Sequence, residues 1–436
     1  MILKSLSLKN FRRFESLEID FHERLTVIVA RNGQGKSTIL DATTVALGTF
    51  VGAFDLGKAE GIHVSDARYA RKGEHSENEQ QFPVTVSAGF SDPDIQIERE
   101  LTGPKNRTTI KGAAELTNYG KSLMTQVRNL KDVTLPVIAY YGSGRLWVTH
   151  KNMERKSVLS ESRSMGYEDC LSSASNYTQI QQWMAKATYA VLQQQSMPHH
   201  EGSSLPGQVE YIKSTVNKVL ASEGWSNFHY NLSHEQLAMV HGDHGTLPVS
   251  LLSDGVRAMV SLTADLAWRC AKLNPHLGRD TSAKTPGIVF IDEVDMHLHP
   301  AWQQKVITSL QDAFPEVQLV VTTHSPQVLT TVSKECIRLI QGNDVYLPAV
   351  NSMGEESRTV LEDIMHVPSR PKTRMSEKLT EYLERVNRGD IESSDVLALR
   401  SELEKHYGVS SQLRLADMMI NRWKAVQKAK QKKNLE

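Results

Sequence analysis

Apolar residues alternate with polar ones, or run together, through the first thirty positions of the chain. Residues 2–8 and 17–21 alternate in part, which is typical of strands with one buried face. Residues 25–30 are almost continuously apolar, which indicates a strand buried on both faces. From Lys36 the apolar positions take the spacing of an amphipathic helix. The chain therefore begins as an α/β fold, with strands followed by a helix.

The pattern farther along the chain predicts four regions. Short strand-like segments follow the first helix and predict an antiparallel β subdomain. The stretch that begins near residue 151 is rich in Ser, Gln, Met and His, with helical spacing near 176–195 and 207–222. The predicted regions are 1–150 and 246–350 as two lobes of one α/β fold, 151–245 as a mainly helical insertion between them, and 351–436 as a helical C-terminal region.

The bulk composition is that of an ordinary globular chain and adds little to this picture. Of 436 residues, 39% are hydrophobic and 23% are charged, and 50 basic residues balance 50 acidic ones, so net charge does not indicate nucleic acid or a membrane. Cys170, Cys270 and Cys336 are far apart, so neither a disulfide framework nor a zinc site is expected. Neither a signal peptide nor a run of about 18 apolar residues occurs. A cytoplasmic protein without membrane attachment is expected.

Residues 29–38 join the buried strand to the first helix and have the composition of a phosphate-binding loop. Backbone N–H groups of a Gly-rich turn can surround a phosphate chain, and a helix N-terminus favours negative charge. Lys36 is expected to reach the β- and γ-phosphates of ATP, and Ser37 to ligate Mg²⁺. The predicted nucleotide-binding residues are Asn32, Gly33, Gln34, Gly35, Lys36, Ser37 and Thr38. Ala30 stands where such loops usually have their first glycine, and its small side chain should preserve the turn.

Residues 286–293 consist of a turn, four apolar strand residues and two adjacent acids. A buried strand that ends in two carboxylates is typical of the Walker B segment of ATPases. Asp292 is predicted to hold Mg²⁺ through water, and Glu293 to activate the attacking water as a general base. The pattern gains specificity because it occurs together with the Lys36 loop.

Two further segments occur at spacings that support a nucleotide site. Ser253 begins a helical pattern 39 residues before Asp292, and its surroundings resemble the LSGGQ signature of ABC ATPases. Ser253 and Gly255 are expected to bind a γ-phosphate held by another subunit, the alternative being a helix-capping serine. His324 follows an apolar strand, 31 residues after the second acid, and resembles a switch histidine that contacts the γ-phosphate. A structural histidine is the alternative.

Three arginines are weaker candidates. Arg12 and Arg13 follow the first strand and are predicted to flank the nucleotide base or its phosphates. Arg145 follows a later strand and a polar turn, and it is either a phosphate or interface residue or a structural one.

Several histidines and a basic terminus have competing interpretations. His297 and His299 could ligate a metal, but no third ligand is evident, and their position favours a D-loop at a dimer interface. The pair at 199–200 is interpreted as exposed loop residues. Residues 422–433 hold six basic side chains and no acidic one, which could contact nucleic acid or form a solvated terminus.

Taken together, these motifs resemble the RecF/SMC/OLD-type ABC ATPases, whose soluble heads associate with DNA or act in anti-phage defence. The resemblance spans residues 1–345, with the insertion unmatched. The segments that carry it are 9–14, 32–38, 253–257, 291–300 and 323–326. It implies an ABC-type head in which two protomers enclose two Mg-ATP molecules, with Ser253 and Gly255 of one facing Lys36 and Ser37 of the other.

Within this class, residues 139–147 and 361–371 look similar to PtuA, the ATPase family of Septu and retron defence systems. The chain lacks the long coiled coil of an SMC protein and the acidic cluster of an OLD nuclease. The resemblance implies a regulatory ATPase that controls a separate HNH nuclease of the PtuB type through homo-oligomer assembly. DNA or a retron RNA/DNA is a further implied partner.

Two other functions fit the same residues. A RecF-like ATP-dependent DNA clamp would use the basic terminus to bind duplex DNA. A scaffold held together by ATP, with little hydrolysis, would accommodate Ala30 and the lack of a recognisable Q-loop glutamine.

Overall fold

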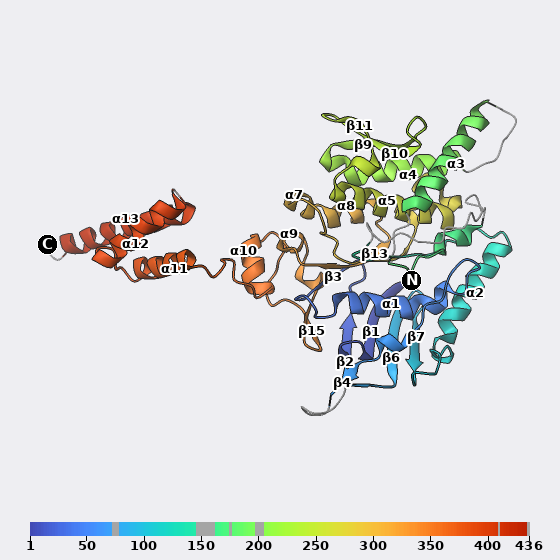
Figure 1. Ribbon diagram of the computed structural model, residues 1–436, viewed down its shortest axis with the longest axis horizontal. Coiled ribbons are helices and arrows are strands. Elements are labelled where there is room, and N and C mark those ends of the chain that lie inside the picture. The colour runs from blue at the N-terminus through green and yellow to red at the C-terminus, as the bar shows by residue number, and fades with distance from the viewer. Residues whose placement is uncertain (72–77, 145–161, 174–176, 197–204, 409, 434–436) are drawn as a thin grey trace. The chain divides into compact units, whose positions relative to one another are not determined.

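The computed structural model of the protein describes residues 1–436 except 72–77, 145–161, 174–176, 197–204, 409 and 434–436 (Figure 1). The chain forms two compact units, Met1–Met365 and His366–Glu436, each with its own hydrophobic core.

A six-stranded, largely parallel sheet lies at the centre of the first unit, with the order β15-β14-β3-β13-β12-β8. Its strands are β3 (Leu25–Val29), β8 (Val137–Tyr141), β12 (Gly287–Ile291), β13 (Val317–Thr323), β14 (Ile337–Gln341) and β15 (Asp344–Tyr346). Every residue of β3, β8, β12 and β13 is buried, which explains their continuous apolar runs. The carboxyl ends of β3, β13 and β12 emerge side by side, because these strands are parallel neighbours.

A four-stranded antiparallel sheet, in the order β2-β1-β6-β7, forms the β subdomain that the sequence predicts. Its strands are β1 (Ile2–Phe11), β2 (Phe14–Asp20), β6 (Val84–Ser91) and β7 (Ile95–Leu101), and a short pair, β4 (Tyr69–Ala70) and β5 (Glu79–Gln80), lies nearby. Helix α1 (Lys36–Val51) lies between this sheet and the central one (Figure 1). The buried Gln318 of β13 exchanges two 2.8 Å hydrogen bonds with the backbone of Leu3 and so joins the two sheets.

The other face of the central sheet is covered by α5 (Asp254–Leu273), with α3 (Tyr177–Ser196) and α4 (Leu205–Leu220) packed beyond it (Figure 1). The region predicted as a mainly helical insertion also contains two strands of a three-stranded sheet, whose third strand begins at the end of that region. Its strands are β9 (Trp225–Asn231), β10 (Gln236–His241) and β11 (Gly245–Pro248). Residues of β9 are mostly polar and half-exposed, so a periodic apolar pattern does not reveal them.

Shorter helices complete the first unit. They are α2 (Ala114–Arg128), α6 (Thr281–Lys284), α7 (Pro300–Gln303), α8 (Val306–Ala313), α9 (Pro326–Leu329) and α10 (Ser357–Thr359). The second unit consists of α11 (Arg374–Asn387), α12 (Ser394–Tyr407) and α13 (Ser411–Lys433). These three helices pack around their own small core, centred on Leu379, Tyr382 and Leu403.

Candidate active site

The phosphate-binding loop connects β3 to α1 through a left-handed turn. Gly33 and Gly35 have φ angles of 74° and 92°, which glycine adopts without steric cost. A Cβ atom on Gly35 would lie 2.5 Å from the ring of Phe14 and 2.9 Å from the side chain of Arg13. The N-cap residue of α1 is Gly35, which has no side chain to cap the first backbone N–H groups, and such a helix start can bind an anion.

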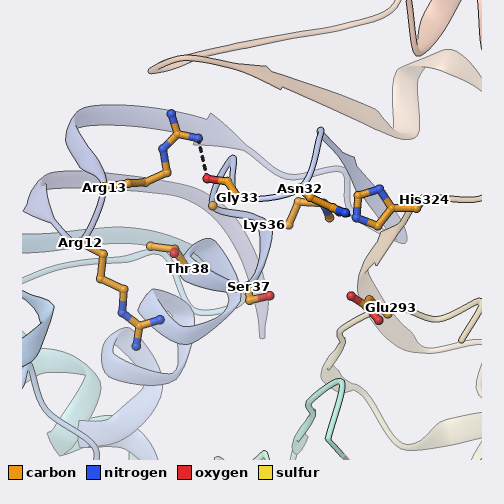
Figure 2. A pocket seen from close by; sticks show the side chains of 10 residues that line it. Arg12, Arg13, Asn32, Gly33, Lys36, Ser37, Thr38, Glu293 and His324 are labelled. Carbon is orange, nitrogen blue, oxygen red and sulfur yellow. Dashed lines mark hydrogen bonds between the residues drawn. The ribbon is translucent and has the colours of Figure 1, made fainter. Parts of the chain in front are cut away.

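Most of the predicted site residues surround one cavity of about 450 Å³ beside this loop (Figure 2). Its lining consists of Arg12, Arg13, Asn32, Gly33, Gly35, Lys36, Ser37, Thr38, Glu293 and His324. The predicted residue Gln34 lies next to it, because Arg13 donates hydrogen bonds to the Gln34 side chain at 2.6 Å and to the Gly33 carbonyl at 3.2 Å. Loops that are distant in sequence therefore meet at the carboxyl edge of the sheet, where ligands of α/β folds bind.

Asp292 links the Walker B strand to the phosphate-binding loop. Its Oδ2 atom accepts a 2.8 Å hydrogen bond from the Ser37 hydroxyl, and its Oδ1 atom accepts a 2.6 Å bond from Thr322. The Asp292 side chain is almost fully buried. A hydroxyl beside a carboxylate is a suitable donor set for Mg²⁺, which takes few protein oxygens and completes its shell with water and phosphate. Ser37 and Asp292 are thus the residues that could hold this ion.

Lys36 and His324 contact each other across the cavity. The Lys36 Nζ atom donates to the Ala30 carbonyl at 3.1 Å and to His324 Nε2 at 2.5 Å. Burial lowers the pKa of His324, and the positive charge of Lys36 lowers it further. Burial also lowers the pKa of Lys36, although the carboxylates of Asp292, Glu293 and Asp295 oppose this shift. Because an ammonium group has no acceptor, the contact is a hydrogen bond from the Lys36 ammonium to the imidazole Nε2 atom.

Glu293 occupies a strained backbone position at the cavity edge. Its φ angle of 49° places a non-glycine residue in the left-handed region, which costs about 1–3 kcal/mol. Two hydrogen bonds hold this turn: the Glu293 N–H donates to the Thr322 hydroxyl at 2.8 Å, and the Val294 N–H to the Thr322 carbonyl at 3.0 Å. The surrounding structure thus fixes the backbone of Glu293 where β12 ends.

The signature segment lies at the start of α5, away from this cavity. Ser253 precedes the helix, as predicted, but the described residues that line the cavity include neither Ser253 nor Gly255. Gly255 packs against the D-loop, since an added Cβ would lie 2.4 Å from the His297 carbonyl oxygen. Within one chain the signature residues are therefore not brought to the Lys36 loop.

The structure adds polar contacts that the sequence did not indicate. Arg12 bonds to Asp41 and, at 2.9 Å, to Asp66, and Figure 2 shows its side chain pointing away from Lys36 and His324. Arg12 also lines a second cavity of about 350 Å³, where Tyr140 donates a 2.8 Å hydrogen bond to Asp41. Asp41 lies on α1 and Asp66 lies before β4, and no spacing along the sequence would have identified either as a partner of Arg12.

The D-loop and the helix after it are anchored by residues at the end of β13 and just beyond it. The Thr323 hydroxyl donates to Asp295 at 2.5 Å, and the Ser325 hydroxyl donates to Gln303 at 2.6 Å. Among the described residues, no three His, Cys, Asp or Glu side chains form a cluster able to hold a metal ion. The loop histidines His297 and His299 thus have no such cluster in the described part of the chain.

Some candidates lie outside the described residues. These are Arg145, the histidine pair at 199–200 and the side chains of the basic tail beyond position 428. Within the described part of the tail, Trp423, Lys424 and Lys428 are exposed on α13. None of the helices in the described part is both long and apolar enough to cross a bilayer.

Comparison with known proteins identifies related ATPases. A family described as an AAA domain matches residues 5–220, and a second, described as an AAA domain, putative AbiEii toxin, Type IV TA system, matches residues 176–330. The chain is 25% identical to the retron Vc95 probable ATPase of Vibrio cholerae, over 93% of this chain and 87% of that protein.

Two other similarities are more limited in extent or identity. The Septu protein PtuA of Bacillus thuringiensis is 36% identical over 104 residues, which are 22% of this chain and 26% of that protein. The solved SMC head domain from Thermotoga maritima superposes with a TM-score of 0.41 at 17% identity, covering 81% of this chain and 97% of that one.

Proposed function

Because the chain is an ABC-type ATPase of the RecF/SMC/OLD class, we propose that it hydrolyses ATP beside Lys36 and uses the nucleotide to control a nuclease in a cytoplasmic anti-phage defence complex. The observation that carries the hydrolytic part is the position of Asp292, bonded at 2.8 Å to Ser37 on the phosphate-binding loop. This contact supports the proposal, because it joins the phosphate-binding loop to the strand that carries the two acids.

Each residue around the cavity receives a role from its chemistry. The backbone of Asn32, Gly33, Gln34, Gly35 and Thr38 surrounds the phosphates, and Lys36 neutralises the β- and γ-phosphates. Ser37 would ligate Mg²⁺ and Asp292 would hold it through water, and the ion would supply charge neutralisation at the transferred phosphate. Glu293 orients and activates water, and His324 contacts the γ-phosphate. Arg12 and Arg13 flank the nucleotide.

A second copy of the chain completes the site. Ser253 and Gly255 begin a helix whose first N–H groups suit a phosphate, yet they lie outside the cavity of their own chain. A two-fold dimer would bring the signature residues of one protomer to the ATP of the other. The lobes 1–150 and 246–350 would form this ATP-dependent dimer. The region 351–436 would support larger assemblies and partner binding.

The similarity to a retron ATPase over 93% of this chain supports a role in defence. The shorter similarity to PtuA supports a separate HNH nuclease of the PtuB type as the controlled partner, and DNA or a retron RNA/DNA as a further component. Closing the dimer requires the γ-phosphate, so hydrolysis would change the assembly that holds the nuclease.

The hydrolytic proposal is tested with Glu293→Gln. Loss of the general base should lower kcat by roughly 100-fold or more while ATP binding persists. Size-exclusion chromatography with light scattering should then show a dimer that ATP holds closed. The matched control is Glu316→Gln, because Glu316 is exposed and contacts only Arg24, at 3.6 Å, among the ion pairs described. Unchanged turnover in the Glu293→Gln protein would contradict the assigned role.

The partner proposal is tested by native mass spectrometry of the chain purified together with the product of its neighbouring gene. Several ATPase copies bound to a nuclease, with a stoichiometry that responds to ATP, are expected. A solitary chain that dimerises with ATP and binds no second protein would contradict the defence proposal.

A repair clamp is the second candidate, favoured by the exposed Lys424 and Lys428 on α13. It predicts binding to duplex DNA that requires ATP and weakens steeply with salt. The absence of binding at low salt would exclude it.

A further inference from the structure

Thr322 is a buried polar residue behind the proposed catalytic acids. It lies near the carboxyl end of β13, is fully inaccessible to solvent and does not line the nucleotide cavity. Its neighbours Val320 and Val321 are apolar, and packing alone would favour another valine at this position. A buried hydroxyl costs free energy unless its hydrogen bonds are made.

The Thr322 hydroxyl makes both kinds of hydrogen bond open to it. It donates to Asp292 Oδ1 at 2.6 Å and accepts from the backbone N–H of Glu293 at 2.8 Å. One oxygen atom therefore contacts two consecutive acids at the end of the neighbouring strand.

The bond to Asp292 fixes the direction of its carboxylate. With Oδ1 bound to Thr322, Oδ2 faces the Ser37 hydroxyl at 2.8 Å. A carboxylate without this second bond could rotate about its side-chain torsions, and the oxygen that faces Ser37 would lose its defined position. The orientation matters because Ser37 and Asp292 are the two groups that would hold the proposed Mg²⁺.

The bond to the Glu293 N–H stabilises a strained turn. Glu293 has a φ angle of 49°, which a non-glycine residue keeps only where the surrounding structure holds it. The side chain and the carbonyl of Thr322 together bind two successive N–H groups of this turn, those of Glu293 and Val294.

We propose that Thr322 is a positioning residue for ATP hydrolysis, which sets the carboxylate of Asp292 and the backbone of Glu293 through a single hydroxyl group. The inference rests on the roles proposed above for Asp292 and Glu293. Thr322 does not line the nucleotide cavity, and it acts through the two acids. Partners of this kind commonly change metal affinity or activity by about 10- to 100-fold when they are removed.

The test compares three purified variants of the full chain. Thr322→Val keeps the shape and removes the hydroxyl, whereas Thr322→Ser keeps the hydroxyl. Thr263→Val is the matched control, since Thr263 is equally buried but its hydroxyl has no hydrogen-bond partner among the described residues. The readouts are kcat, KM for ATP, the Mg²⁺ concentration that gives half-maximal rate, ATP binding in EDTA and the melting temperature.

Thr322→Val should lower kcat and raise the half-saturating Mg²⁺ concentration, each by roughly 10-fold or more, with ATP binding in EDTA unchanged. Thr322→Ser should stay within about threefold of the parent, because its hydroxyl can make the same two bonds. Thr263→Val should match the parent in kcat, in KM for ATP and in Mg²⁺ dependence. A purely structural role would lower the melting temperature without changing the Mg²⁺ dependence.

Two outcomes would overturn the inference: parental turnover and Mg²⁺ dependence in Thr322→Val, or an equal loss in Thr322→Ser. If Thr322→Val does not fold, Thr322→Ala removes the same hydroxyl with a smaller side chain and is judged by the same criteria. Glu293→Gln, assayed in parallel, distinguishes a failure of the proposed function from a failure of the inference about Thr322. Its full activity would refute the proposed function, whereas its inactivity beside an unaffected Thr322→Val refutes only the inference.

Discussion

A buried ion pair in α5 provides a direct test of how the head is stabilised. Arg269 and Asp265 are four residues apart, with side chains 1% and 4% exposed. The guanidinium donates to Asp265 Oδ2 at 2.8 Å and to the carbonyls of Gly166 and Glu168 at 2.9 Å and 3.0 Å. Tyr141 donates to the same Asp265 oxygen at 2.7 Å. The network joins the signature helix to β8 and to the segment before Cys170.

The substitution Asp265→Asn removes the charge of this network with little change in shape. Oδ1 of Asp265 has no hydrogen-bond partner among the described residues, so an amide nitrogen can replace it while the other oxygen keeps its bonds. Burial disfavours the charged guanidinium, but attraction to Asp265 outweighs it and raises the pKa of Arg269 above its usual value. Without Asp265 the guanidinium remains charged and loses its counterion. An uncompensated buried charge of this kind costs about 3–5 kcal/mol.

Urea unfolding followed by tryptophan fluorescence measures this cost, with the buried Trp268 close to the pair. The shift of the midpoint multiplied by the slope gives the change in the free energy of unfolding. The control is Asp280→Asn, in an i,i+4 pair with Lys284 at 2.7 Å whose side chains are both 60% exposed. It should cost no more than about 1 kcal/mol. A loss for Asp265→Asn that equals the control would refute the reasoning.

Two further predictions concern the phosphate-binding loop. Gly35→Ala should weaken ATP binding, measured by calorimetry, by at least roughly tenfold, because the new methyl group would collide with Phe14 at a backbone position in the left-handed region. The control Gly242→Ala should leave ATP binding unchanged, because a Cβ atom at Gly242 would have nothing within 4 Å. Lys36→Met should raise the pKa of His324 in an NMR titration, since burial would then be opposed by the carboxylates alone. In the parent, at pH values between the lowered pKa of folded His324 and its ordinary pKa, unfolding takes up a proton at this residue. The free energy of unfolding therefore falls as pH falls through that interval. An unchanged His324 pKa in Lys36→Met would contradict the contact between the two side chains.

The strands and loops of the nucleotide site could be predicted because local patterns determine them. Continuous apolar runs identify β3 and β12, and the chemistry of residues 32–38 needs a turn that only particular residues can form. The two acids and His324 follow strands, and parallel strands place their carboxyl ends at one edge. Their meeting beside Lys36 thus follows from fold class and chain order.

Contacts made by side chains across distant segments could not be predicted in the same way. Thr322 looks like an ordinary β-branched strand residue, and nothing in its sequence context indicates that it binds Asp292. The partners of Arg12, Asp41 and Asp66, lie 29 and 54 residues away, on α1 and on a loop. Sheet β9-β10-β11 was likewise missed, because its strands are short, and only β10 has a run of buried apolar residues, which is three residues long.

The close packing of Gly255 on the His297 carbonyl has a consequence for the timing of two ATP molecules in the proposed dimer. The signature helix of each chain would touch the nucleotide held by its partner, while Gly255 presses on the D-loop that follows its own Glu293. A movement of that helix when the partner's ATP binds must therefore displace the loop beside the chain's own catalytic acid. Hydrolysis at the two ATP sites would then be coupled, in a concerted or alternating order. One inactive protomer in a mixed dimer would suppress ATP turnover at both sites.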